Sequence, residues 1–253
     1  MPPPEEPVPM KRVCVIGDSH TAALKAGWTS IADEFPDADL TFFAARRELL
    51  VSLEVQDGVL VTEDQRLRRA FEASSGGADR IEPRFDRYLL CGLGSGVNSV
   101  IPLLRAHRPA TLARDDRQAL SNACYAACMA RVLALTPMMW MLGRLRQISD
   151  APAVVVGPPL PVSRPAFTRL HASGEDAIFM SLYAGAWQSL TAPLGARVLP
   201  QPRETLDGSA MSTNPIYFRG GEHLADKSDD QSHANAEYGA IVLRAALRAL
   251  RKR

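Results

Sequence analysis

The chain has 253 residues, of which 46% are hydrophobic and 23% are charged, and its net charge is +1. These values are ordinary for one globular domain, although the length lies at the upper end for a single core. The near-neutral charge gives no general attraction to nucleic acid or to an anionic membrane surface, so neither is expected as a partner.

The first ten residues differ in composition from the rest of the chain. Residues 1–10 are rich in proline and also acidic, which predicts a disordered lead-in. We expect residues 11–253 to form a single domain. The lead-in has neither the basic start nor the apolar centre of a secretory signal. We therefore expect the chain to work in the cytoplasm.

Four cysteines lie in apolar stretches of the sequence: Cys14, Cys91, Cys124 and Cys128. Such residues are most often buried free thiols. The Cys-x-x-x-Cys spacing of the second pair, without further Cys or His ligands, is poor evidence for zinc. We expect no metal and no organic cofactor, and free thiols agree with a reducing compartment.

The first part of the chain predicts two strands, a helix and a hairpin. Residues 13–17 are a short continuous apolar run, typical of a buried strand, and residues 21–35 predict a helix that ends before Pro36. Residues 39–44 predict a second strand. The Asp-Gly pair at 57–58, between two apolar runs, is a strong signal for a β-hairpin inserted after the second strand. Two roles are open for this hairpin, a wall of the substrate site or a purely structural flap.

A long helical region follows the third predicted strand. Residues 74–77 (Ser-Ser-Gly-Gly) predict a loop, and residues 87–91 predict the strand. Residues 113–148 have a helix-forming composition, but Pro137 requires a bend because proline removes a helix hydrogen bond. The apolar patch at 137–142 is too short to span a membrane. It predicts core packing or, alternatively, an adaptable lining for an apolar substrate group.

The remaining elements complete a sheet. Residues 152–159 predict a fourth strand that ends in a rigid proline turn, residues 175–190 an amphipathic helix, and residues 197–200 a short fifth strand. A polar loop over 201–232 then leads to a helix over 236–250. Five strands alternating with helices predict an α/β protein with a five-stranded parallel sheet and right-handed crossovers.

Three polar side chains stand next to the ends of predicted elements. Ser19 follows the first strand, and Asp230 and His233 precede the last helix. Open α/β sheets bind ligands at the carboxyl edge of their strands, which is where Ser19 is expected. A serine hydroxyl needs a base to become nucleophilic, and that base needs a partner that fixes its tautomer. The set predicts Ser19 as nucleophile, His233 as general base and Asp230 as the orienting carboxylate.

The turn around Ser19 contains two further polar residues, Asp18 and His20. Both are expected to shape the turn. His20 is a competing base by proximity, but adjacent residues in a turn rarely point at each other. The first amides of the following helix favour negative charge at the same place.

Both ends of the chain resemble a known family. Gly-Asp-Ser-His at 17–20 resembles the first block of the SGNH (GDSL-type) hydrolases, in which the serine is the nucleophile. Asp-Gln-Ser-His at 230–233 resembles their last block, Asp-x-x-His, which supplies the other two triad members. The resemblance frames the chain from about residue 11 onward. It implies a flavodoxin-like three-layer α/β/α fold and the hydrolysis or transfer of ester-linked acyl groups.

The middle of the chain departs from the family pattern at the groups that would hold the oxyanion. The family has a glycine after the second strand, whereas this chain offers the main-chain amide of Ala45 or a neighbour. The amide of Ser19 is a further candidate donor. The family's next block is Gly-x-Asn, but Gly94 stands in the place of the asparagine, so Gly94 is a candidate as well. Asn98 comes four residues later and either reaches back or caps the next helix. Arg46 and Arg47 hint at an anionic substrate group, although solvated surface charge is the simpler interpretation.

These observations predict a serine esterase or deacylase that hydrolyses an O-acyl ester, such as an acetyl ester, through an acyl-serine intermediate. The expected partner is a small-molecule or glycan ester. One alternative is an O-acyltransferase that uses the same three residues, because both reactions share the acyl-enzyme. The other alternative is a non-catalytic binding domain on the same fold.

Overall fold

Five parallel strands form the central sheet of the chain. The computed structural model describes residues 12–112, 116–163, 170–219, 230 and 232–251. The strands are β1 (Arg12–Gly17), β2 (Asp39–Ala44), β5 (Arg87–Cys91), β8 (Ala153–Val156) and β9 (Ala196–Leu199). They lie in the order β2-β1-β5-β8-β9. This flavodoxin-like order confirms the predicted α/β fold. The lead-in at 1–10 lies outside the described residues.

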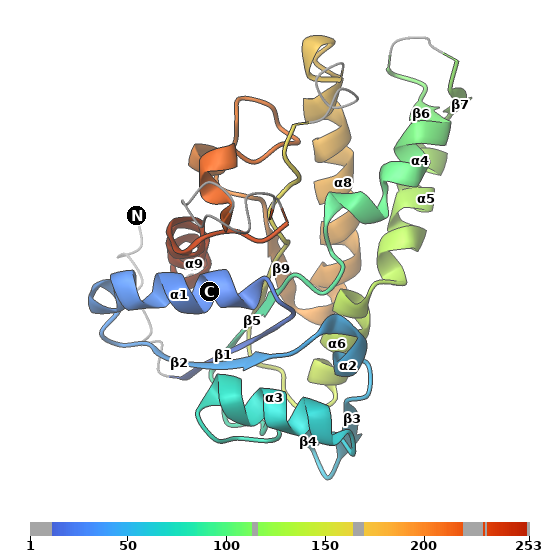
Figure 1. Cartoon of the computed structure of the whole chain (residues 1–253). Coiled ribbons are helices and arrows are strands. Elements are labelled where there is room, and N and C mark those ends of the chain that lie inside the picture. The colour runs from blue at the N-terminus through green and yellow to red at the C-terminus, as the bar shows by residue number, and fades with distance from the viewer. Residues whose placement is uncertain (1–11, 113–115, 164–169, 220–229, 231, 252–253) are drawn as a thin grey trace, which may run out of the picture.

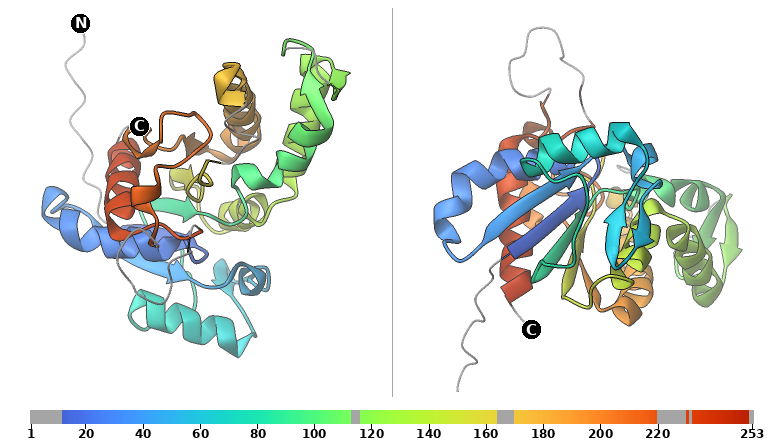
Figure 2. Two further views of the ribbon diagram at one scale, coloured as in Figure 1. Left: turned by 45° about the horizontal axis from the view of Figure 1, so that its top comes forward. Right: turned by 90° about the horizontal axis from the view of Figure 1, so that it is seen from below.

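Helices lie on both faces of this sheet (Figure 1). The helices are α1 (Thr21–Ile31), α2 (Arg47–Leu50), α3 (Gln65–Ser75), α4 (Ile101–Ala106), α5 (Asn122–Ala134), α6 (Pro137–Arg146), α8 (Glu175–Thr191) and α9 (Ala236–Arg251). Of these, α4 and α5 extend away from the sheet beside α8 (Figure 1). Val13 and Val15 pack in one buried cluster with α1 and α9. Ile16 packs in a second cluster with α3, α6 and α8. Figure 2 shows α3 on the face opposite α1 and α9. Alternate side chains of each strand therefore enter two cores, which gives the predicted three layers.

The predicted hairpin is present as β3 (Glu54–Gln56) and β4 (Val59–Val61). Asp57 and Gly58 both have positive φ, 50° and 73°, as a two-residue type I′ turn requires. Leu60 is fully buried, and its backbone pairs with Ile81. The inner side of the hairpin is therefore part of the core, which favours the structural role.

The predicted helix over 113–148 is wrong at its start. Residues 118–120 form the short strand β7 (Gln118–Leu120), which pairs with β6 (His107–Pro109), and residues 113–115 lie outside the described part. Helix α5 begins only after Ser121, whose hydroxyl accepts a hydrogen bond from the Cys124 amide. Serine at this position satisfies an amide that the helix itself leaves free, so it fixes the helix start.

The expected break at Pro137 is confirmed, because α5 and α6 meet there at an angle of 68°. Proline occupies the first turn of α6, where no helix hydrogen bond is lost. Met138, Met141 and Leu142 are fully buried, which confirms core packing for the apolar patch. Among the described helices none is long and apolar enough alone to span a membrane, and only the bent pair α5 and α6 reaches those criteria together.

Two further expectations need correction. Ser74 and Ser75, expected in a loop, belong to the last turn of α3. All four cysteines are free, but burial holds only for Cys14 and Cys91, since Cys124 is exposed and Cys128 half-buried. Cys124 and Cys128 lie on the outer side of α5, so their apolar neighbours in sequence do not surround them in space.

Candidate active site

Ser19 lies exposed in the turn between β1 and α1. This turn is at the carboxyl end of β1, which is a central strand of the sheet. The buried carboxylate of Asp18 holds it in place by accepting hydrogen bonds from the amides of His20 (3.2 Å) and Leu93 (2.8 Å). Because Leu93 follows β5, Asp18 ties the Ser19 turn to the loop of the neighbouring strand. Asp18 thus shapes the turn as expected.

His233 connects Ser19 to Asp230. Its Nε2 lies 3.0 Å from Ser19 Oγ, and its Nδ1 lies 3.0 Å from both carboxylate oxygens of Asp230. An ionised carboxylate only accepts hydrogen bonds, so Nδ1 carries the hydrogen and Nε2 of the neutral ring accepts from the serine hydroxyl. The structure therefore brings together the three side chains that were selected from the sequence.

The Asp230 carboxylate is held ionised. Burial alone would raise the pKa of Asp230, but hydrogen bonds from the amides of Ser232 and His233 and from the imidazole outweigh it and lower the pKa. Both amide nitrogens lie 3.1 Å from Oδ1. A charged carboxylate at this place orients the imidazole and stabilises its protonated form.

The meeting of Ser19 and His233 depends on two helices whose backbones touch. Ser19 precedes α1 and His233 precedes α9. A side chain at Gly239 of α9 would collide with the carbonyl of Ala23 in α1, and one at Gly27 would collide with the backbone of α9. Only glycine permits this approach, so the two residues fix the distance between the helices.

His20 lies beside His233 but makes no bond to Ser19. The two imidazole centroids are 5.5 Å apart, and His20 Nδ1 is buried without a hydrogen-bond partner among the described residues. Burial lowers the pKa of His20, and the charges of His233 and Arg47 lower it further against the opposing effect of Asp18. His20 is therefore neutral near pH 7, and its position agrees with a shaping role rather than that of the base.

The predicted oxyanion donors differ in whether the structure leaves them free to bind a ligand. The Ala45 prediction is wrong, because this amide donates to the carbonyl of Gly17 at 3.2 Å and continues the ladder between β1 and β2. The amides of Ser19 and Gly94 have no hydrogen-bond partner in the described part of the chain. Asn98 lies exposed in a 3-10 turn, and helix α4 begins after Val100 without a side-chain cap, so the capping interpretation is also wrong.

Arg47 occupies the space next to Gly94. A Cβ built at Gly94 would lie 3.4 Å from Arg47 Nη1 and 3.3 Å from Pro137 Cδ. Arg46 forms an ion pair with Glu48 at 2.7 Å, whereas no described residue pairs with the guanidinium of Arg47. Arg47 also acts electrostatically on His20. Of the two arginines, only Arg47 therefore contributes positive charge to the site, and the missing side chain at Gly94 is the sequence signal that could have indicated it.

No three His, Cys, Asp or Glu side chains in the described ranges are grouped as a metal ion would require. Of the predicted polar loop, residues 220–229 and 231 lie outside the described part.

Neither a protein-family model nor a curated protein matches the sequence. Similar solved structures include an extracellular lipase from Streptomyces rimosus, with TM-score 0.48, 11% identity, and coverage of 93% of this chain and 99% of that one. A putative arylesterase from Agrobacterium tumefaciens str. C58 has TM-score 0.40, 15% identity, and coverage of 96% and 99%. The periplasmic domain of a lipopolysaccharide acetyltransferase from Salmonella ser. Paratyphi A has TM-score 0.43, 11% identity, and coverage of 95% and 83%. These are similarities of fold.

Proposed function

We propose that this protein is a serine esterase or deacylase that hydrolyses carboxylic ester bonds. The observation that carries the proposal is the continuous line of hydrogen bonds from Asp230 through His233 to Ser19, each 3.0 Å long. Ser19 Oγ attacks the ester carbonyl carbon while its proton passes to His233 Nε2. The bond to the alcohol then breaks, and His233 returns the proton to the leaving oxygen. Water attacks the acyl-serine in the same way and frees Ser19.

Hydrolysis is favoured over transfer to another alcohol by the exposure of Ser19. Bulk water can reach an acyl group bound at an exposed turn, whereas an acyltransferase must exclude water to protect its intermediate.

The negative charge that develops on the carbonyl oxygen requires donors on the same side as Ser19. The unpartnered amides of Ser19 and Gly94 supply two hydrogen-bond donors. We assign a third contribution to the guanidinium of Arg47, which lies against Gly94 where an asparagine side chain would otherwise start. A fixed positive group near a developing oxyanion stabilises the transition state more than the neutral ester.

Replacing Arg47 by alanine is expected to lower kcat/KM by about 10²–10³-fold, the usual loss for one oxyanion donor. Arg46→Ala is the matched control, because the Arg46 guanidinium already pairs with Glu48 and should change activity little. Adding Gly94→Asn to Arg47→Ala is expected to recover part of the activity, since asparagine tolerates the φ of +72° at this position. Equal losses for both arginine variants would contradict this role.

A fluorophosphonate probe tests the function directly, because it reacts covalently with an activated serine. We expect the purified protein to be labelled and Ser19→Ala to remain unlabelled. Mass spectrometry of the labelled peptide would identify the modified residue. Labelling that persists in Ser19→Ala would show that another residue is the nucleophile and would refute the role of Ser19. No labelling of the unmodified protein at saturating probe would refute the esterase proposal and favour a non-catalytic binding domain.

A further inference from the structure

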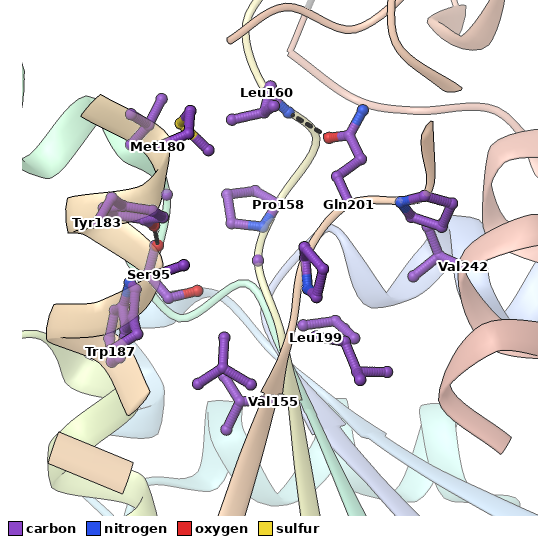
Figure 3. Close-up of a pocket in the computed structure, with 18 of the residues that line it drawn as sticks. Ser95, Val155, Pro158, Leu160, Met180, Tyr183, Trp187, Leu199, Gln201 and Val242 are labelled. Atoms are coloured by element: carbon purple, nitrogen blue, oxygen red, sulfur yellow. Dashed lines mark hydrogen bonds between the residues drawn. The ribbon is translucent and has the colours of Figure 1, made fainter. Parts of the chain in front are cut away.

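A cavity of about 570 Å³ opens at the carboxyl ends of β8 and β9, between α8 and α9. Ser19, Asp230 and His233 are not among its lining residues. Figure 3 shows Met180, Tyr183 and Trp187 of α8 along one wall, with Leu199 and Val242 on the other side. The volume lies within the range of small-molecule binding sites.

Most of the polar side chains that line the cavity are engaged with protein partners. Gln201 Oε1 accepts from the Leu160 amide at 2.9 Å and from the Tyr238 hydroxyl at 3.1 Å, and its Nε2 donates to two threonine hydroxyls. The Tyr183 hydroxyl donates to the carbonyl of Ser95, and the Ser95 hydroxyl donates to the carbonyl of Gly92.

Few polar groups remain for a ligand. Gln188 and Arg203, which are both exposed, also line the cavity. A sugar or another polyhydroxyl ligand would lose its hydrogen bonds to water on entering without gaining equivalent ones, which is unfavourable. An alkyl chain loses none, so the chemistry of the lining selects an apolar ligand.

The cavity is connected to the Ser19 turn through one loop. Leu93 binds the Asp18 carboxylate, and Ser95 and Gly96, just beyond it, line the cavity. Strand β5 alone separates β1 from β8, and two strand spacings amount to about 10 Å. An acetyl group held at Ser19 is too short to cover that distance, whereas an alkyl chain of medium length reaches it.

We propose that this cavity binds a medium-length alkyl chain of the ester substrate, an inference that rests on the proposed esterase function. Each methylene that leaves water for an apolar site raises binding about fourfold. Octyl acetate and ethyl octanoate each carry six methylenes more than ethyl acetate, so the ester whose chain enters the cavity should be preferred over ethyl acetate by about 10³–10⁴-fold.

Two isomeric esters, ethyl octanoate and octyl acetate, test the proposal and show whether the chain lies on the acyl or the alcohol side. Ala184→Phe adds a ring at an exposed position of α8 that lines the cavity. Ala177→Phe is the matched control, since Ala177 is also exposed on α8 but lies outside the lining. We expect Ala184→Phe to lower kcat/KM at least tenfold for one of the two isomers and to leave ethyl acetate unchanged.

Calorimetric titration of octan-1-ol into Ser19→Ala measures binding of an alkyl chain to the cavity in the absence of ester hydrolysis. Binding that Ala184→Phe abolishes and Ala177→Phe preserves would support the proposal even if no esterase activity were found. Octanol that does not bind, or isomeric esters that respond equally to both phenylalanine variants, would overturn it. If octanol binds in this way but the unmodified protein hydrolyses neither ester, the result would count against the proposed function and not against the cavity.

Discussion

Replacing His233 by alanine is expected to lower kcat by about 10⁴–10⁶-fold, because removal of the proposed general base leaves Ser19 as an unactivated hydroxyl. His233 Nε2 is the group within hydrogen-bond distance of Ser19 Oγ, at 3.0 Å. Initial rates with a chromogenic ester measure the loss, and circular dichroism shows whether the variant is folded.

His20→Ala is the control for this experiment. Its ring lies 5.5 Å from that of His233, so both variants remove an imidazole from the same region. Because His20 makes no bond to Ser19, turnover should fall by no more than about 10²-fold, the loss that a misplacement of about 1 Å can cause. A His20 variant that loses as much activity as the His233 variant would show that the base has been assigned to the wrong histidine.

Gly239→Ala is expected to destabilise the fold by about 3 kcal/mol or more. The added methyl group would meet backbone atoms, among them the Ala23 carbonyl in α1, and no side chain at the contact can move to make room for it. Moving α1 and α9 apart also separates Ser19 from His233, so activity should fall together with stability. Urea unfolding monitored by circular dichroism gives the free energy.

Gly143→Ala provides the comparison for the stability measurement. Gly143 is also helical, in α6, but a Cβ there would contact nothing within 4 Å. This variant should gain about 0.5–1 kcal/mol from helix propensity. If both variants changed stability in the same direction, the contact between α1 and α9 would not be the cause.

The parts of this fold that could be predicted are those with a local signal. Five short apolar runs marked the strands, and the Asp57-Gly58 turn marked the hairpin. Ser19 and His233 could be selected because their motifs border a strand and a helix. Each of these predictions depends only on residues that are close in sequence, because the hydrophobic pattern of a short segment indicates which element it forms.

The remaining features depend on contacts between distant segments. Nothing near Ala45 in the sequence indicates that the ladder between β1 and β2 continues and uses its amide. Arg47 begins α2 and Gly94 lies in the loop after β5; the absent side chain at Gly94 marks an open space, but nothing near it in the sequence identifies Arg47 as the group that occupies that space. The cavity is formed by β8, β9, α8 and α9 together. Gln201 accepts the hydrogen bonds of the Leu160 amide and the Tyr238 hydroxyl, so these donors are not available to a ligand. Such features follow from tertiary packing.

The contact between α1 and α9 has a consequence for the order of events during synthesis. Ser19 and His233 are 214 positions apart, so the proposed nucleophile leaves the ribosome long before the proposed base. Until α9 docks on α1, the emerging chain carries an inert serine, and closing so large a loop is slow. Recovery of ester hydrolysis during refolding should therefore lag behind formation of the sheet. In such an experiment activity reports the completion of folding rather than its beginning.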